Sequence, residues 1–504
     1  MSMKILLANP ATRVALDDKY ERFFIKAGSR WPWSTIKRND EKNTNIFFPF
    51  YLAYSAAVLK KNGFEVHVID GVAMDMREEE FLERVNHIRP DALIIETTTH
   101  AINFDIALVK KIKSSIPDVK IVFTGPHVTV YSREILKDNE AVDFITLGEY
   151  EFTLLELFTR LRDSSPGLKI TGLAYRRGQE VWVSPEKGFI KDINELPYPE
   201  FGLFPCNKSP DLATYTDGVC TYYPAVTLHS SRGCPFQCDF CLWNQVMYSN
   251  GKYRTFSPKR VVDEMEHVIS NYGAREIYFD DDDFCISKKH VLAICKEIID
   301  RKLNIKWSCM GDAMCADEEM ISAMADAGCI FMKFGVESGN KKILMNIGKP
   351  LKPEKAIEIS KLCGKYKIRC HATFSFGLDG ETKETMQETL RLANKIKFDY
   401  GQASITTPFP GTRYYDKLVK RGELKEVGWD KFDGTSTCVF DTTCLSSEEI
   451  ERFRKKAIKS MILHKVTDPV WLYRFIERSF VLMRNQGLRT TLAPFKSIYY
   501  TFFK

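Results

Sequence analysis

The sequence has no long apolar run. Its 504 residues are 44% hydrophobic and 27% charged, as in a globular protein, and no stretch of about 18 apolar residues could span a membrane. Residues 1–10 suggest a strand and a turn, without a signal-peptide cleavage pattern. Fourteen cysteines in such a chain favour thiols and metal ligation over a disulfide framework. We therefore predict a cytoplasmic protein of roughly two to four folded units.

A GxGxxG motif is also missing, which argues against a dinucleotide site in the first 150 residues. This region alternates apolar strand-like runs with helical periodicity. Such α/β alternation predicts a Rossmann-like, parallel, doubly wound sheet with ligands at the carboxyl ends of its strands. Expected strands cover residues 3–9, 65–70, 92–96, 120–123 and 144–147, and expected helices cover 51–62, 81–87 and 106–116.

A second alternating series starts at Ala225. Six strand–helix units predict a partial (β/α)6 barrel, whose active site lies at the carboxyl ends of the strands. Expected strands cover residues 225–229, 276–279, 305–309, 331–334, 369–376 and 401–406, and expected helices include 258–272, 289–302 and 318–327.

Three cysteines follow the first strand of this series, in Ser231-Arg-Gly-Cys-Pro-Phe-Gln-Cys-Asp-Phe-Cys241. Cys234, Cys238 and Cys241 supply thiolates at a CxxxCxxC spacing, and soft sulfur donors suit the irons of a [4Fe–4S] cluster. A fourth cysteine would close the cluster, whereas three leave one iron open to another ligand. A zinc loop and three unrelated core cysteines remain as alternatives.

Four later segments fall at strand ends, where the active site of such a barrel belongs. Residues 280–283 are four consecutive aspartates, which repel one another unless a cation lies among them. The alternative for this segment is a solvated acidic turn. The other three segments are Gly335-Val-Glu-Ser-Gly339, Phe376-Gly-Leu-Asp-Gly-Glu-Thr382 and Pro408-Phe-Pro-Gly-Thr412.

In chain order, the cysteine loop and these four segments resemble the radical S-adenosylmethionine (SAM) superfamily. The resemblance implies that the open iron chelates the amino and carboxylate groups of SAM, and that the cluster donates an electron that cleaves SAM to a 5′-deoxyadenosyl radical. Asp379 stands where the family's GLPGET turn usually has proline, which leaves the geometry of that turn open. The implied SAM contacts are Phe240 at the adenine, Asp281 and Asp282 at the ammonium group, and Glu337 with Ser338 at the ribose hydroxyls.

The N-terminal series resembles the cobalamin-binding domain that precedes many radical SAM cores. A glycine at a strand end lets the planar corrin approach the backbone closely, and threonine hydroxyls suit its nucleotide tail. The alternative is a Rossmann-like domain without the cofactor. The landmarks are Asn9-Pro10, Pro49-Phe-Tyr-Leu-Ala-Tyr54, Gly63-Phe-Glu-Val-His-Val-Ile-Asp70, Gly125-Pro-His127 and Gly148-Glu149-Tyr-Glu151. The implied cobalamin contacts are Thr97, Thr98, Thr99, Gly125, Pro126, His127, Gly148 and Glu149.

The DxHxxG motif, which supplies a histidine below cobalt in other cobalamin proteins, is absent. His67, His100 and His127 lack its spacing. We therefore expect bound cobalamin to have no protein histidine on cobalt.

Together the two resemblances imply a cobalamin-binding-domain radical SAM enzyme with three cofactors: a [4Fe–4S] cluster, SAM and cobalamin. The implied reaction is C-methylation, in which methylcobalamin carries a methyl group and the deoxyadenosyl radical activates an unactivated substrate carbon. A radical SAM cyclase or rearrangement enzyme of the porphyrin-ester cyclase kind is the alternative, and a non-catalytic iron–sulfur or corrinoid binding protein is a third reading. The implied partners are a small-molecule or lipid-like substrate and an electron donor such as flavodoxin or ferredoxin.

Four regions are expected: residues 1–155 as the cobalamin-binding domain, 156–220 as a linker, 221–430 as the radical SAM core and 431–504 as a helical extension. The extension should hold helices at residues 447–464, with Ser447 as the N-cap, and 471–485. From Glu451 to Lys504, twelve Lys or Arg face three Asp or Glu, and ten aromatics are interleaved with them. This composition fits peripheral contact with an anionic membrane, or a barrel cap whose basic residues are solvated. No nucleic-acid partner is expected.

The remaining cysteines show no CxxC pairing, and most should be buried small hydrophobes. A second cluster that uses Cys438 and Cys444 with two distant partners is the alternative.

Overall fold

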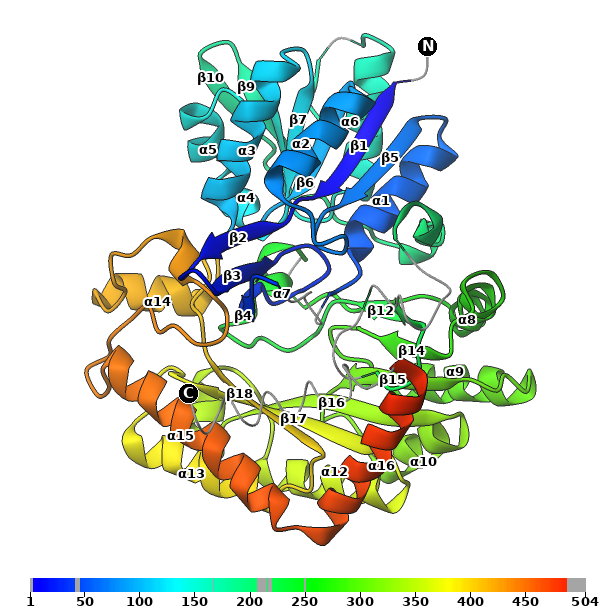
Figure 1. The fold of residues 1–504 in the computed structure, drawn as a ribbon, viewed down its shortest axis with the longest axis vertical. Coiled ribbons are helices and arrows are strands. Elements are labelled where there is room, and N and C mark those ends of the chain that lie inside the picture. The colour runs from blue at the N-terminus through cyan, green and yellow to red at the C-terminus, as the bar shows by residue number, and fades with distance from the viewer. Residues whose placement is uncertain are drawn as a thin grey trace.

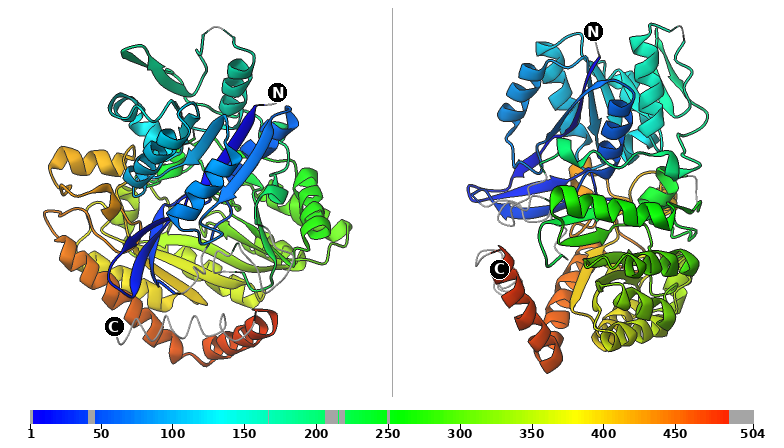
Figure 2. Two further views of the ribbon diagram at one scale, coloured as in Figure 1. Left: turned by 45° about the horizontal axis from the view of Figure 1, so that its top comes forward. Right: turned by 90° about the vertical axis from the view of Figure 1, so that its right-hand side faces the viewer.

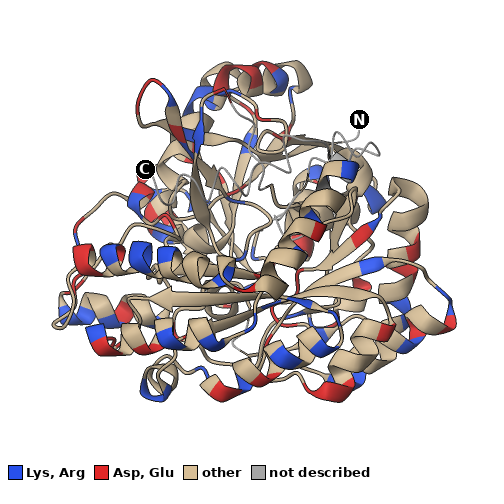
Figure 3. Ribbon diagram, turned by 60° about the horizontal axis from the view of Figure 1, so that its bottom comes forward, with Lys and Arg blue, Asp and Glu red and all other residues tan. Residues whose placement is uncertain are grey.

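The computed structural model describes residues 3–40, 46–165, 167–205, 215, 220–248 and 251–486. Two α/β units lie one above the other, with the N-terminal unit at the top of Figure 1 and a second large sheet with its helices below. In Figure 3, charged residues colour the outer helices, whereas the strands of the large sheets are mostly tan. The two sheets therefore form the apolar layers on which the helices pack.

The N-terminal sheet has the strand order β10-β9-β8-β7-β6-β1-β5. Its strands β5, β1, β6, β7 and β8 are parallel, which confirms the doubly wound prediction. Strand β6 is buried along its whole length, as expected for a parallel sheet covered on both faces. The parallel strands are β1 (Lys4–Asn9), β5 (Glu65–Asp70), β6 (Ala92–Glu96), β7 (Lys120–Thr124) and β8 (Phe144–Thr146). The helices are α1 (Phe50–Lys61), α2 (Glu78–Ile88), α3 (Ile102–Ser115), α4 (Pro126–Val130), α5 (Ser132–Asp138) and α6 (Glu151–Arg162).

The first part of the expected linker belongs to this domain. Helix α6 runs across residue 155, and β9 (Leu173–Arg177) and β10 (Glu180–Val183) extend the sheet as an antiparallel edge. The sequence does not predict the attachment of these strands to β8, because the partner of an edge strand is set by tertiary packing.

A second, small sheet is inserted between β1 and α1. Strands β2 (Thr12–Ala15), β3 (Tyr20–Ile25) and β4 (Trp33–Arg38) pair in antiparallel order, and Figures 1 and 2 place them between the two large units. No strand is predicted there from the sequence, because charged residues interrupt every apolar run. We call residues 12–38 the insert.

The lower sheet is the expected partial barrel, with six parallel strands in the order β11-β14-β15-β16-β17-β18. Its strands are β11 (Ala225–Leu228), β14 (Glu276–Phe279), β15 (Lys306–Gly311), β16 (Cys329–Glu337), β17 (Arg369–Phe376) and β18 (Tyr400–Ile405). Its helices are α7 (Leu242–Val246), α8 (Pro258–Tyr272), α9 (Lys288–Asp300), α10 (Glu318–Asp326), α11 (Lys341–Asn346), α12 (Pro353–Lys365), α13 (Lys383–Lys395) and α14 (Arg413–Arg421). A short pair, β12 (Ser231–Arg232) with β13 (Arg254–Thr255), flanks the cysteine loop.

Two helices, α15 (Ser447–Val466) and α16 (Pro469–Gln486), complete the described chain. The expected N-cap at Ser447 is wrong by one residue. Ser446 caps α15, because its hydroxyl accepts from the backbone N of Glu449 at 3.3 Å and the Glu449 carboxylate accepts from the backbone N of Ser446 at 3.0 Å.

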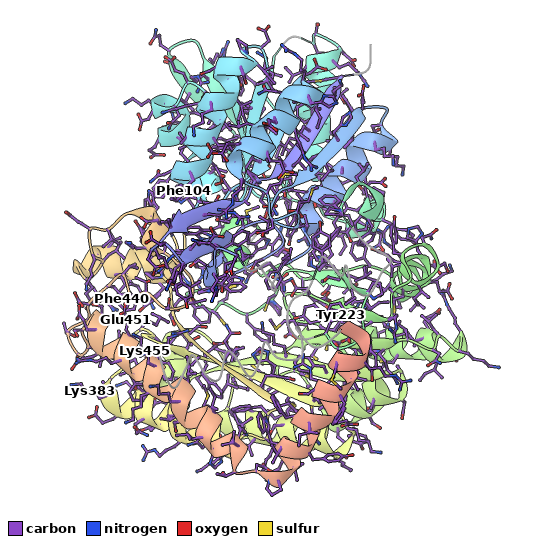
Figure 4. All side chains as sticks on the ribbon, viewed as in Figure 1. Phe104, Tyr223, Lys383, Phe440, Glu451 and Lys455 are labelled. Atoms are coloured by element: carbon purple, nitrogen blue, oxygen red, sulfur yellow. The ribbon has the colours of Figure 1, made fainter. Side chains whose placement is uncertain are left out.

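The inner faces of α15 and α16 pack on the barrel. Arg454 donates to the carbonyl of Ala403 in β18 at 2.9 Å, and the indole of Trp471 donates to the carbonyl of Asp399 at 2.8 Å. In Figure 4, Glu451 and Lys455 lie along α15 near Lys383 of α13. No helix in the described part of the chain is long and apolar enough to cross a membrane.

A buried ion-pair network joins the two large units. Arg232, which is inaccessible to solvent, lies 2.7 Å from Glu151 and 3.1 Å from Glu149. Glu149 also pairs with Arg254 at 2.7 Å. Because Arg232 precedes the cysteine loop and both glutamates follow β8, this network fixes that loop against the N-terminal sheet.

Replacing Arg232 with Met should therefore destabilise the protein. Removing one partner of a buried ion pair leaves uncompensated charge, and we expect the free energy of unfolding to fall by about 3–5 kcal/mol. Arg38→Met is the control, because its pair with Asp40 is 44% and 68% exposed and such surface pairs contribute about 0–1 kcal/mol. Urea unfolding followed by circular dichroism measures both variants. If both variants lose the same small amount of unfolding free energy, the network does not hold the two units together.

Candidate active site at the carboxyl ends of the barrel strands

The three predicted cluster cysteines lie in one short loop after β11. Cys241 donates its backbone N–H to the carbonyl of Cys238 at 3.2 Å, and α7 begins at the next residue. Gly233 adopts φ 88°, and a Cβ there would lie 2.1 Å from the backbone oxygen of Lys252. Only glycine fits this position, which immediately precedes Cys234. The loop is therefore built to hold its three thiols at the mouth of the barrel.

Burial raises the pKa of all three thiols, to about 12 for Cys238. Lys349 opposes this effect at Cys238, and Arg30 opposes it at Cys241. Free thiols in this setting keep their protons at neutral pH, so a metal must displace those protons. The irons of a cluster would supply the positive charge that buried thiolates need.

The two aspartates expected at the SAM ammonium group have different surroundings. Asp281 is fully buried and accepts from the backbone N of Ser230 at 2.7 Å and the hydroxyl of Ser231 at 2.6 Å, so it ties β14 to the end of β11. Asp282 instead accepts from the backbone N of Gly233 at 2.8 Å. Of the two carboxylates, Asp282 is therefore the one that contacts the cysteine loop.

Asp283, in the same turn, lies close enough to Cys234 to contribute to the raised pKa of that thiol. Burial, with a further contribution from Asp312, raises its pKa to about 8. Its Oδ1 accepts from the backbone N of Cys285 at 2.8 Å, and its Oδ2 has no hydrogen-bond partner among the described residues. The alternative of a solvated acidic turn does not hold, because Asp280, Asp281 and Asp283 are all buried.

Glu337, the residue expected at the ribose, is held in a strained conformation. It has φ 64°, unusual for a non-glycine residue, and a bulge interrupts the pairing of β16 with β17 beside it. A Cβ on Gly335 would lie 2.1 Å from Oε1 of Glu337, so the side chain folds back over a glycine. Its Oε2 accepts from the hydroxyl of Ser375 at 2.8 Å. Such strain is typical of a functional position.

Lys349 is a site residue that sequence reasoning missed. Its ammonium group is 2.9 Å from Asp312 and 3.5 Å from Glu337, and it is 8% exposed. Asp312 and Glu337 raise its pKa in spite of burial, which keeps it cationic beside Cys238. Lys349 lies in the loop between α11 and α12 and not at a strand end. No sequence spacing therefore marks it as part of a site that is built from strand ends.

Two further residues of the SAM prediction have structural contacts. Phe240 packs against apolar side chains of α11, and its ring contacts the ring of Trp31 edge-on with a centroid separation of 6.3 Å. The hydroxyl of Ser338 is buried and lies 3.3 Å from that of Thr389 on α13. Phe240 is therefore at the cysteine loop, whereas Ser338 faces a barrel helix.

The departure at Asp379 has a physical explanation. Its carboxylate accepts from Lys417 at 2.8 Å and Arg421 at 2.7 Å, both on α14. Lys417 also binds Asp239, inside the cysteine loop, at 2.7 Å. An aspartate in this turn therefore anchors α14 and, through Lys417, the loop itself.

The residues expected at cobalamin gather at the carboxyl ends of β6, β7 and β8. Thr97, Thr98 and Thr99 are buried, and the hydroxyls of Thr98 and Thr146 have no hydrogen-bond partner among the described residues. Gly125 adopts φ 108°, and a Cβ there would lie 2.4 Å from the backbone oxygen of Thr97. Orphaned hydroxyls at a strand-end edge fit a polar cofactor that would use them.

The Gly148-Glu149 pair is placed between the domains. Glu149 is fully engaged by Arg232, Arg254 and the backbone N of Ile190, the last at 2.9 Å. Gly148, at φ 77°, approaches Gly188 closely. These contacts account for both residues without a corrin.

The three histidines occupy different places. His67 is 38% exposed and pairs with Glu65 at 2.8 Å on edge strand β5. His100 is buried at the end of β6 and stacks on Phe24 of the insert with a centroid separation of 4.9 Å. His127, in α4 after Pro126, is also buried, and its Nδ1 lies 3.2 Å from the hydroxyl of Thr99. Burial lowers the pKa of His100 and His127 to about 3, so both are neutral.

The described cysteines outside the loop are mostly buried, as expected. The exceptions are Cys315, which is partly buried, and Cys444, which is exposed. In the described part of the chain, no three Cys, His, Asp or Glu side chains converge on a site for a single metal ion.

Known proteins resemble the chain in both units. Residues 228–393 match the radical SAM superfamily, and residues 42–158 match the B12 binding domain. The chain is 32% identical over 416 residues to the uncharacterized methyltransferase PH0819 of Pyrococcus horikoshii, a match that covers 82% of this chain and 88% of the relative. It is 27% identical to the anaerobic magnesium-protoporphyrin IX monomethyl ester cyclase of Cereibacter sphaeroides, over 76% of this chain and 62% of that protein.

The fold is also that of a solved enzyme. The radical SAM methyltransferase TsrM from Kitasatospora setae superimposes with a TM-score of 0.67 at 16% identity, over 92% of this chain and 89% of that one. A radical SAM domain takes a [4Fe–4S] cluster and SAM, and a B12 binding domain takes cobalamin. With both domains in the expected order and the cysteine loop at the barrel mouth, the chain belongs to the cobalamin-binding-domain-containing radical SAM enzymes.

Proposed function

We propose that this chain is a cobalamin-dependent radical SAM methyltransferase that transfers a methyl group to an unactivated carbon of its substrate. The observation that carries the proposal is that the candidate cluster and corrin sites share one interface. Arg232, two residues before Cys234, pairs with Glu149 after β8, and Thr129 of α4 lies 3.8 Å from the sulfur of Met247, which follows α7. A substrate that binds at this interface would lie between the two candidate sites.

When bound, the cluster and SAM supply the radical that activates a carbon, and cobalamin carries the methyl group. The protein's part is to bind and orient. Cys234, Cys238 and Cys241 would hold three irons, Asp282 would accept the ammonium group of SAM, and Glu337 would accept its ribose hydroxyls. The threonines at the end of β6 would bind the polar edge of the corrin or its nucleotide tail.

A cyclisation or rearrangement with the same cofactors is the second candidate, because relatives include the ester cyclase of Cereibacter sphaeroides. Product analysis separates the two. A methyltransferase forms S-adenosylhomocysteine together with 5′-deoxyadenosine, whereas a cyclase forms 5′-deoxyadenosine alone. A protein that binds the cofactors without catalysis forms neither.

We further propose that the substrate is a small molecule or lipid-like, and that flavodoxin or ferredoxin supplies the reducing electron. Reduction by each protein, followed as 5′-deoxyadenosine formation, tests the donor. If the enzyme turns over with a chemical reductant but with neither flavodoxin nor ferredoxin, the proposed electron donors are refuted.

We also propose peripheral contact with an anionic lipid surface through α15 and α16. The outward face of α16 is apolar: Val470, Tyr473 and Phe480 are 61%, 69% and 62% exposed. The outward face of α15 carries Lys455 and Lys456, next to Arg452 and Lys459 in one groove. The inner faces of α15 and α16 pack on the barrel. The alternative in which these helices only cap the barrel therefore accounts for their inner faces but not for their outward faces. Residues 487–504, which contain five of the ten aromatics noted above, lie outside the described residues.

Phe480→Glu should weaken co-sedimentation with anionic vesicles. Each basic residue near an anionic surface contributes about 1 kcal/mol, and the attraction should fall with salt because the screening length is about 8 Å at physiological ionic strength. Met345→Glu is the matched control, because Met345 is 78% exposed but lies on α11. Equal recovery on anionic and neutral vesicles, unaffected by salt or by Phe480→Glu, would refute the contact.

A further inference from the structure

The connection between β3 and β4 reaches from the insert into the mouth of the barrel. Arg30, in this connection, donates to the backbone oxygen of Asp280 and, at 2.8 Å, to its Oδ1. Its Nε lies 3.6 Å from Oδ1 of Asp282. The three side chains are 14%, 12% and 9% exposed, so the contact is shielded from solvent.

The next residue anchors the same connection. The indole of Trp31 donates to the carbonyl of Gly434 at 2.7 Å. Its ring meets Phe240 and Phe409 edge-on, with centroid separations of 6.3 and 5.1 Å. Arg30 is therefore held over the cysteine loop by packed neighbours.

Asp282 joins Arg30 to the cysteine loop. Its Oδ2 accepts from the backbone N of Gly233, while its Oδ1 faces Arg30. A carboxylate has about four acceptor positions, so these contacts leave room for another donor. Asp281 has less room, because Ser230 and Ser231 already donate three hydrogen bonds to its two oxygens.

We propose that Arg30 is a positioning residue of the SAM site, which holds and orients Asp282 so that its remaining acceptor positions take the ammonium group of SAM. The inference rests on the proposed function, because it takes the cysteine loop as the cluster site. Asp280 and Asp282 repel each other when both are ionised, and the fixed guanidinium charge beside them offsets that repulsion. Without Arg30, this repulsion would turn one carboxylate away, which would remove an acceptor from the ammonium group.

The test is Arg30→Met in the cluster-reconstituted enzyme, with SAM binding measured by anaerobic equilibrium dialysis. We expect the dissociation constant for SAM to rise at least about tenfold, as for the loss of one charge-assisted contact, with iron and sulfide content unchanged. Arg30→Lys keeps the positive charge but lacks the planar set of guanidinium donors, so it should recover part of the affinity for SAM. The SAM-induced change in the electron paramagnetic resonance of the reduced cluster should shift to higher SAM concentration in parallel.

Arg22 supplies a matched control. It also joins the insert to the barrel, through Asp433 at 2.8 Å, in a contact that does not involve the acids after β14. Arg22→Met should leave SAM binding unchanged. Unchanged or tighter SAM binding in Arg30→Met, or an equal loss in both variants, would overturn the proposal. A wild-type protein that assembles no cluster would instead refute the proposed function, so the two failures are distinguishable.

Discussion

Replacing Cys234, Cys238 and Cys241 together with alanine should abolish SAM cleavage. These three thiolates would hold three irons, and the loop contains no other cysteine among the described residues that could replace them. After anaerobic reconstitution, the variant should lack the visible absorption of an iron–sulfur cluster. Formation of 5′-deoxyadenosine with SAM and a reductant should fall to the level without enzyme.

Cys315→Ala is the control for this triple variant. Its thiol is partly buried and lies beside Asp283, so the change removes a nearby sulfur without touching the loop. This variant should keep the full iron and sulfide content. A complete four-iron cluster in the triple variant would mean that other cysteines hold the catalytic iron.

Withholding cobalamin should stop methyl transfer while leaving SAM cleavage intact. The two candidate sites use different strands and different residues, since the cysteine loop follows β11 whereas the threonines end β6. Enzyme prepared without cobalamin should still form 5′-deoxyadenosine but no methylated product. Equal methyl transfer with and without cobalamin would contradict the cofactor assignment.

The bound cob(II)alamin should show no superhyperfine splitting from a histidine nitrogen in electron paramagnetic resonance, because we expect no protein histidine on cobalt. His100 directly follows Thr99, and His127 lies 3.2 Å from the Thr99 hydroxyl, so these two are the residues to change if splitting appears. His67→Ala is the control, since that side chain pairs with Glu65 on an edge strand. Splitting that disappears in His100→Ala or His127→Ala would overturn the expectation.

Most of the two large sheets could be predicted from the sequence. Strands such as β6 and β14 are short apolar runs between helices of clear periodicity, and local pattern fixes both their type and their order. The cysteine loop and the acids after β14 were identifiable for the same reason: each follows a strand directly, so parallel topology places them at one edge.

The contacts that complete the site could not be predicted, because they join distant parts of the chain. Arg30 and Asp280 are 250 residues apart, and Lys349 follows a helix rather than a strand end. The insert that carries Arg30 has charged residues on every strand, so periodicity does not mark it. Likewise Glu149 matched a cobalamin landmark, but only the fold shows its carboxylate bound to Arg232.

The most direct test of the central claim is transfer of a labelled methyl group. The reconstituted enzyme, with cobalamin and reductant, is incubated anaerobically with SAM deuterated in its methyl group and a metabolite extract of its source cells. We predict a metabolite that gains the labelled methyl on carbon, with S-adenosylhomocysteine and 5′-deoxyadenosine formed in step with it. Formation of 5′-deoxyadenosine and a product without label or S-adenosylhomocysteine would contradict the claim and indicate a cyclase or rearrangement enzyme.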